Sequence, residues 1–196
     1  MSQLLVEYFP LHYDQQQILT EAANNPNGTI KLKGILQRAD ADNQNGRRYP
    51  KAILARESAK YDTDFIKQRR ALGELDHPES TVVNLRNVSH NITEVHWEGD
   101  DLVGTIEVLS TPSGNIVREL MKNGIRLGVS SRGVGSIRSL GEGKVEVEDD
   151  FNLICFDIVS NPSTHGAFLN ENAQIKINPN ANLENLIRDF LAEIDT

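Results

Sequence analysis

The sequence has few of the features that would place the chain in a membrane, in an oxidising compartment or on nucleic acid. Its one cysteine, Cys155, cannot form an internal disulfide, so a reducing environment is expected. No stretch approaches the roughly 18 consecutive apolar residues of a membrane span, and no secretory signal is visible at the N-terminus. With 20 Lys and Arg against 28 Asp and Glu, the net charge of -8 repels phosphate backbones. These absences predict a soluble, unexported chain that binds neither a membrane nor nucleic acid.

What the chain does have is enough apolar sequence for one folded core. Of its 196 residues 38% are hydrophobic, a composition that excludes a collagenous or wholly disordered protein. Neither a repeat of fixed period nor a long linker interrupts residues 1–170, which predicts a single domain there. In residues 171–196 an Asn-rich stretch precedes apolar residues at helical spacing on an acidic segment. This pattern predicts a polar linker and an amphipathic C-terminal tail helix.

The first 170 residues are patterned as many strands and few helices. Alternating or apolar runs predict strands at 30–37, in a hairpin within 87–110, from residue 125 onward, and across 143–160. Pro50 can open a helix that runs to about residue 69, and Thr111 with Pro112 begins a helix that ends before Gly124. The balance predicts an α+β fold in which a mostly antiparallel β-barrel is surrounded by a few helices.

Three segments place a reactive side chain beside glycine or proline: ALGELDHPE, LGVSSRGVG and FDIVSNPS. They supply His77, Ser130 or Ser131, and Asp157. These are the residue types of an acyl-transfer triad, in which an imidazole takes the serine proton, a third group orients the imidazole, and N–H donors stabilise the oxyanion. Histidine suits the base because its ordinary pKa of about 6.5 lies close to neutral pH.

Strand alternation distinguishes the two serines. In a strand that begins at Ile125, Ser131 shares the aliphatic face, whereas Ser130 lies on the opposite face. Ser130 is therefore the predicted nucleophile, and Ser131 is expected to be packed or hydrogen-bonded inward. The residues predicted to contact the oxyanion and the substrate lie next to these two serines in the sequence. Gly128 leaves room for a substrate chain, and the Arg132–Gly133 segment can present a backbone N–H to the oxyanion.

Asp157 lies in NLICFDIVS, a run that is apolar on both faces and predicts a central strand. Burying an unpaired carboxylate is costly. Asp157 is therefore expected to be protonated, hydrogen-bonded to the backbone, or paired with a base such as His77.

The sequence gives no support for a metal or a cofactor, and none is predicted. The loop at 40–51 is similar to a calcium site, but its glycine is one place late and Lys51 stands where a glutamate is needed. No histidine pair has the HxxxH spacing of a zinc hydrolase. Cys155 lies in an apolar run and is expected to be buried and unreactive.

In four segments that occur in order, the sequence resembles the prohead core (maturation) proteases of T-even-type tailed bacteriophages. The segments are NGRRYPKAIL, GELDHPE, TPSGNIVRELMKNGIRLGVSSRGVGS and FDIVSNPS. The resemblance implies a serine protease with a fold similar to the herpesvirus assemblin protease, with His77 as general base, Ser130 as nucleophile and Asp157 as third member. Herpesvirus enzymes use a histidine in the third role, so His90 and His96 are competing candidates, although their alternation with apolar neighbours predicts exposed positions.

The resemblance also implies the substrates and the compartment. These are the scaffolding core and major capsid proteins of a phage prohead in the host bacterial cytoplasm, cut after Glu in Leu/Ile-x-Glu motifs. The chain contains such triplets at 19–21 and 191–193, and the second predicts self-trimming because it lies in the predicted tail. A homo-oligomer is a general expectation for phage assemblies. The rival hypothesis is a non-catalytic scaffold or capsid-core binding protein that keeps the fold.

Overall fold

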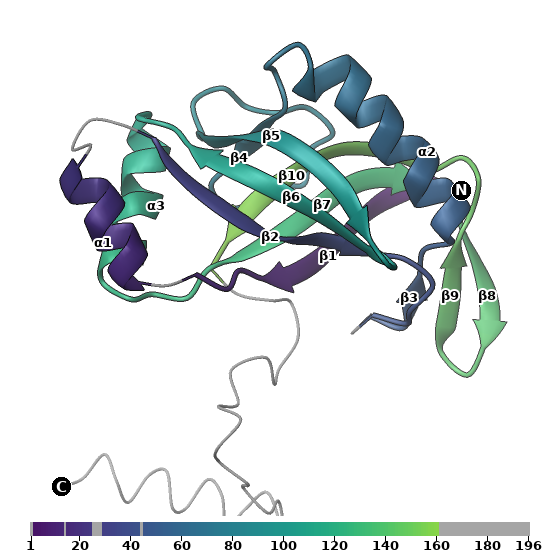
Figure 1. Ribbon diagram of the computed structural model, residues 1–196. Helices are drawn as coiled ribbons and strands as arrows, with labels where there is room; N and C mark the ends of the chain where they lie inside the picture. Colours follow the sequence, from purple (N-terminus) through teal and green to yellow (C-terminus); the bar gives the residue numbers. More distant parts are fainter. Residues whose placement is uncertain (1, 14, 25–28, 44, 161–196) are drawn as a thin grey trace, which may run out of the picture. The chain divides into compact units, whose positions relative to one another are not determined.

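The computed structural model describes residues 2–13, 15–24, 29–43 and 45–160 (Figure 1). The predicted linker and tail helix lie outside these ranges. The helices are α1 (Gln15–Asn24), α2 (Lys51–Tyr61), the π-helical η1 (Asp62–Ile66) and α3 (Pro112–Lys122). The strands are β1 (Gln3–Pro10), β2 (Ile30–Arg38), β3 (Arg47–Arg48), β4 (Leu72–Glu74), β5 (Val88–Glu98), β6 (Asp101–Val108), β7 (Gly128–Gly135), β8 (Ile137–Gly141), β9 (Lys144–Val147) and β10 (Asn152–Val159).

The described strands form three sheets. Their orders are β1–β7–β10, β2–β6–β5–β4 and β3–β9–β8. Every ladder is antiparallel except the short β3–β9 pair. The prediction of mixed helices and antiparallel strands is therefore confirmed.

The predicted closed barrel is wrong for the described residues. The first two sheets join at one isolated bridge, between Leu75 and Ile158. Their other edges, β1 and β2, do not pair with each other. A cavity of about 220 Å³ is lined by residues of both strands and by the loop before β3. The carboxylate of Glu7 in β1 accepts hydrogen bonds from Asn43 Nδ2 of that loop and from Tyr49 Oη just after β3 (3.0 Å), so side chains rather than ladder hydrogen bonds connect this edge to the loop.

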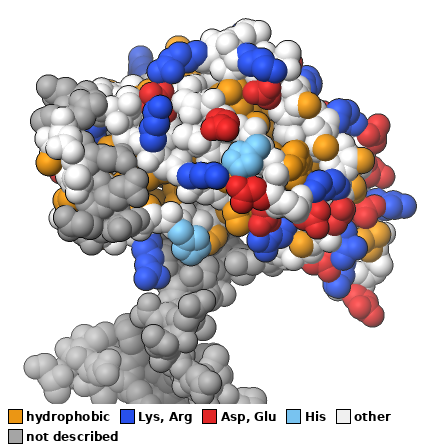
Figure 2. Space-filling view, in the orientation of Figure 1, with side chains coloured by type: hydrophobic (Ala, Val, Ile, Leu, Met, Phe, Trp, Pro, Cys, Tyr) orange, Lys and Arg blue, Asp and Glu red, His pale blue; other side chains and the backbone are white. Residues whose placement is uncertain are grey.

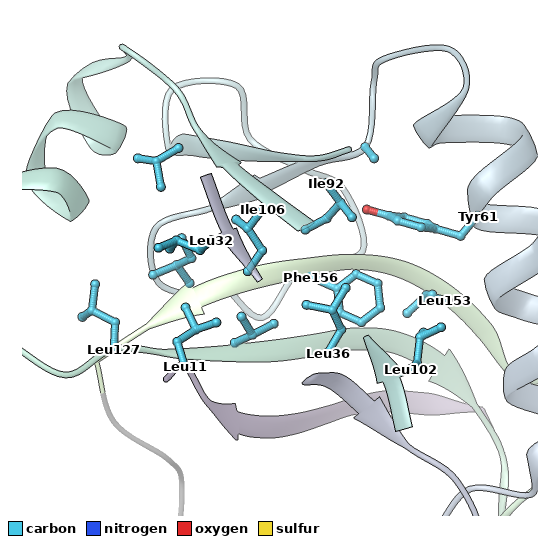
Figure 3. Packing of buried hydrophobic residues seen from close by; sticks show 14 of the residues in the cluster. Leu11, Leu32, Leu36, Tyr61, Ile92, Leu102, Ile106, Leu127, Leu153 and Phe156 are labelled. Carbon is cyan, nitrogen blue, oxygen red and sulfur yellow. The ribbon is translucent and has the colours of Figure 1, made fainter. Parts of the chain in front are cut away.

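The hydrophobic core lies between the first two sheets (Figure 3). Phe156 of β10 is fully buried, as are Ile92 of β5 and Ile106 of β6. Tyr61 at the end of α2 meets the Phe156 ring edge-on, with ring centroids 5.5 Å apart. Burying a side chain of this size contributes about 1.5–3 kcal/mol. These contacts make β10 a rigid support for whatever lies on its other face.

The predicted ends of α3 are confirmed. Thr111 is the N-cap, and its Oγ1 accepts a hydrogen bond from Gly114 N (3.0 Å). Gly124, just past the helix, has a left-handed φ of +74°, which glycine adopts without steric cost. The strand predicted from Ile125 instead begins at Gly128. The cause is that Ile125 N still donates to the carbonyl of Leu120 (3.0 Å), which holds this residue in the helix terminus.

The described surface mixes charges of both signs. On the face drawn in Figure 2, acidic and basic side chains are interspersed. Several charged side chains of the described residues pair, including Arg138 with Glu146 and Lys144 with Asp42. None of the helices within the described ranges has the length and apolar character needed to span a bilayer.

Candidate active site

Three neighbouring segments of the fold carry the residues predicted to be catalytic. Within the first sheet, β10 pairs with β7 and places Asp157 directly opposite Ser130. The chain that leads to His77 runs along the other edge of β10, where Asp76 N donates to the carbonyl of Ile158 (2.7 Å). Segments far apart in sequence thus become adjacent. The central strand of this sheet is β7, and β10 is an edge strand with a single bridge beyond it, contrary to the prediction.

Alternation along β7 separates the two serines as expected. The Oγ of Ser131 accepts a hydrogen bond from Gln37 Nε2 of β2 (3.0 Å), so this hydroxyl points inward and is satisfied. The Oγ of Ser130 is buried and has no hydrogen-bond partner in the described part of the chain. Buried polar groups are nearly always paired, so an unpaired hydroxyl needs an explanation. A hydroxyl that is kept free for a substrate or a base provides one.

His77 follows a sharp change in backbone direction. Asp76 has a left-handed φ of +63°, which aspartate tolerates better than most residues, and its Oδ1 accepts from His77 N (3.1 Å). The Nδ1 of His77 is buried and has no hydrogen-bond partner among the residues the structure describes. Each residue predicted as base or nucleophile therefore retains one unpaired buried polar atom.

Asp157 is fully buried and belongs to a charged network. Its Oδ1 accepts from the backbone N–H of Glu74 (3.0 Å) and from Arg132 Nη2 (3.2 Å), and Arg132 Nε lies 2.9 Å from Oδ2. Burial raises the pKa of this carboxyl, and the Glu74 N–H and the Arg132 charge oppose that rise. Of the three outcomes expected for Asp157, the structure shows the backbone hydrogen bond, together with an ion pair to Arg132.

The residues predicted to contact substrate are enclosed by the protein itself. Arg132 has no exposed side-chain surface. A Cβ added to Gly128 would lie 1.9 Å from Cε2 of Tyr8, and one added to Gly133 would lie 2.4 Å from Cε2 of Phe151. The space expected beside Gly128 for a substrate chain is therefore filled by the Tyr8 ring.

The backbone of β7 at Arg132 lies opposite an irregularity in β10. The register shifts between Leu153 and Cys155, so one extra residue bulges out of the ladder there. Bulges locally disrupt ladder hydrogen bonds and are over-represented next to active sites. The predicted oxyanion role of the Arg132–Gly133 backbone stays a prediction, because on its other side this segment pairs regularly with β1.

The two histidines considered for the third catalytic role, His90 and His96, differ in burial and in hydrogen-bond partners. His90 was expected to be exposed but is completely buried. Its Nε2 donates to the carbonyl of Phe156 (2.9 Å), which leaves Nδ1 to accept from Ser89 Oγ (2.9 Å). Burial lowers the pKa of His90 to about 4. His96 is 37% exposed and pairs with Glu98 (2.8 Å).

Cys155 is buried, as predicted, and its Sγ lies 3.1 Å from Arg132 Nη2. Burial raises the pKa of the thiol, which disfavours the reactive thiolate. Within the described ranges, no three His, Cys, Asp or Glu residues are grouped as they would be around a metal ion.

Sequence reasoning missed two residues that shape this site. Tyr8 covers Gly128, and Glu74 joins the Arg132–Asp157 network. The alternating run QLLVEYF at the N-terminus could have indicated β1, which pairs with β7 along its whole length. The glutamate of GELDHPE had no comparable signal, because its partner Arg132 is brought to it only by the fold.

Comparison with known proteins gives one family and two relatives. The family model described as prohead core protein serine protease matches residues 15–178. The prohead core protein protease of Enterobacteria phage T4 is 33% identical over 143 residues, which is 71% of this chain and 68% of that protein. The solved structure of the bacteriophage T4 capsid assembly protease matches with a TM-score of 0.70 and 26% identity, covering 82% of this chain and 99% of that one.

Proposed function

Because the chain belongs to the family of prohead core protein serine proteases, we propose that Ser130 is its nucleophile and His77 its general base. The chain is a phage capsid maturation protease by its family and its relatives. The observation that carries the residue assignment is the unpaired, buried Ser130 Oγ and His77 Nδ1, on segments that flank the same strand.

The proposed reaction is an acyl transfer in two halves. Neutral His77 takes the Ser130 proton while Oγ attacks the scissile carbonyl carbon, and the carbonyl oxygen becomes an oxyanion. Backbone N–H groups of the Arg132–Gly133 segment stabilise that charge. His77 then gives the proton to the leaving amine, and an acyl-enzyme forms. Water, deprotonated by the same imidazole, releases the second product and restores Ser130.

Asp157 is the third member in this proposal. It is the carboxyl group that lies opposite Ser130 in the β7–β10 ladder, and Arg132 Nε lies 2.9 Å from its Oδ2. His90 is a weaker candidate because both of its ring nitrogens are engaged, with Phe156 and Ser89. His96 is a weaker candidate because it pairs with Glu98 on the surface.

The proposed substrates follow from the two similar phage T4 proteins, one a prohead core protein protease and the other a capsid assembly protease. We propose that this chain cleaves the scaffolding core and major capsid proteins of a prohead in the host cytoplasm. The proposed cleavage follows Glu in Leu/Ile-x-Glu motifs. Self-trimming at 191–193 belongs to the same proposal and lies outside the described residues. The triplet at 19–21 lies in α1, where helical backbone is a poor protease substrate. Homo-oligomer formation and kinship with the assemblin fold remain part of the proposal.

The test is cleavage of a purified scaffolding core protein that contains Leu-x-Glu sites. We expect Ser130→Ala and His77→Ala to lower the rate at least about 10³-fold, and the double variant to be no slower than either, because these residues act as a unit. Ser139→Ala, at an exposed serine of β8, is the matched control and should cut normally. Fragments are identified by mass spectrometry, and circular dichroism checks the fold. Normal cleavage by Ser130→Ala would assign the nucleophile to another residue, and no cleavage by the wild type would favour the non-catalytic scaffold.

A further inference from the structure

The loop that carries His77 has little hydrophobic anchoring of its own. This base loop, residues 75–87, joins β4 to β5 and contains no helix or strand. Val82 and Leu85 are 71% and 74% exposed. Segments with few buried apolar contacts open at low free-energy cost. At its start the loop is held by a backbone hydrogen bond from Asp76 N to the carbonyl of Ile158 (2.7 Å). Beyond His77 it is also held by polar contacts to two fully buried side chains.

Arg132 holds the first half of the base loop. Its Nη1 donates to the carbonyl of Ser80 (2.8 Å), three residues beyond His77. Its Nη2 donates to Glu74 Oε1 (2.9 Å), and its Nε pairs with Asp157 (2.9 Å). One guanidinium on the strand of Ser130 thus contacts the loop, β4 and β10 together.

Glu74 holds the second half of the base loop. Its Oε1 accepts from the backbone N–H of Asn84 (3.0 Å), and its Oε2 accepts from Asn87 Nδ2 (3.2 Å). Glu74 itself has no exposed surface, whereas Asn84 and Asn87 are exposed. Together, Arg132 and Glu74 contact the loop at Ser80, Asn84 and Asn87.

We propose that the Arg132–Glu74 pair is a buried latch that holds the base loop, and with it His77, in register with Ser130. The proposal rests on the proposed function of Ser130 and His77. Arg132 is then a positioning residue whose side chain does not touch substrate, in keeping with its complete burial. The latch requires arginine because only a planar guanidinium can donate in three fixed directions at once, whereas a lysine ammonium is a single compact charge.

The test compares Arg132→Lys with Arg138→Lys. Arg138 also pairs with a glutamate, Glu146, but on the exposed β8–β9 hairpin, so it controls for loss of an Arg–Glu pair. In Arg132→Lys we expect amides of residues 75–87 to exchange hydrogen about tenfold faster, with unchanged protection in β2 and β6. We expect kcat to fall about 100-fold with little change in KM, because a base displaced by about 1 Å costs that much. Arg138→Lys should match the wild type in both measurements.

A second variant keeps the proposal testable if Arg132→Lys does not fold. Asn87 is exposed, and Asn87→Ala removes one bond to Glu74. We expect kcat to fall about fivefold, a smaller effect than in Arg132→Lys. Amide hydrogen exchange should become faster only in the base loop. Wild-type exchange and kcat in the folded variants, or a change confined to KM, would overturn the latch. If the wild type itself cuts nothing, faster loop exchange still supports the latch, and only the proposed function fails.

Discussion

The two faces of the β7–β10 ladder are equally buried but opposite in chemistry. The core face carries Val129 of β7 with Phe156 and Ile158 of β10, all at 0% exposure. The other face carries Ser130, Arg132 and Asp157, at 0–1% exposure. The same two strands therefore build an apolar core on one side and an ionic network with a free hydroxyl on the other.

Of the two faces, only the apolar one is explained by its contribution to stability alone. Apolar area stabilises in proportion to its burial. For buried charges the desolvation cost offsets most of their attraction, so an ion pair contributes little net stability. A polar face that stabilises so little is better explained by the chemistry it supports. Removing one partner of a buried pair still destabilises, because it leaves the other charge uncompensated. Variants on the polar face should therefore lower the rate even where they fold, and folded variants on the apolar face should keep it.

The largest expected effect is on the polar face, at Asp157. Asp157→Asn should lower kcat about 10³- to 10⁴-fold, as when an orienting carboxylate is neutralised. Steady-state cleavage of a core-protein substrate measures it. Asp149→Asn, at an exposed carboxylate paired with Arg56, is the control and should keep wild-type turnover. Near-normal turnover in Asp157→Asn would assign the third catalytic role to another residue.

A variant on the apolar face should lower the stability of the fold and leave kcat nearly unchanged. Phe156→Ala deletes a ring that packs edge-on against Tyr61 and should destabilise folding by about 3–5 kcal/mol. Urea denaturation measures the loss. At a temperature where the variant is still folded, its kcat should stay within about threefold of wild type, because the removed atoms face away from Ser130. A large rate loss in folded Phe156→Ala would show that the two faces are not separable.

The smallest expected effect concerns pH and the buried imidazole of His90. At pH 7 this ring is neutral in both the folded and the unfolded state. Between pH 6.5 and about 4 the unfolded chain takes up a proton that the folded protein refuses, because burial lowers the folded-state pKa to about 4. Stability is therefore lost as pH falls through that window, by about 3 kcal/mol from this group.

Urea unfolding at pH 7.5 and at pH 4.5 tests this expectation. The difference between the two stabilities should shrink in His90→Gln, which has no titrating ring. It should persist in His96→Gln, because His96 is half-exposed and pairs with Glu98. An unchanged pH dependence in His90→Gln would mean that other groups cause the acid sensitivity.

Features set by short-range rules could be predicted from the sequence. The β5–β6 hairpin and the ends of α3 depend on turn and capping residues that lie within a few positions of each other. The inward direction of Ser131 follows from strand alternation, which needs only the correct phase. The predicted alternation of the two serines is correct although the strand begins at Gly128 rather than at Ile125.

Features set by distant partners could not be predicted. Alternation gives the side of a strand, but it does not say what covers that side. His90 is buried because β4 and β10 close over it: a Cβ on Gly73 would lie 2.3 Å from its Nε2. The pairing of β1 with β7 and the ion pairs of Arg132, 58 positions from Glu74 and 25 from Asp157, likewise join residues from different segments of the chain. The barrel prediction failed for the same reason, since closure depends on contacts between β1 and β2.

The position of β7 has a consequence for when the enzyme becomes competent during synthesis. Its two ladder neighbours are β1 and β10, the first and the last strands that the structure describes. A ribosome-bound chain that ends before residue 152 contains the nucleophile strand but not the strand that bears Asp157. Domains generally fold as units once their sequence has emerged. On the catalytic assignment proposed above, a nascent chain would therefore stay inactive until β10 has been synthesised.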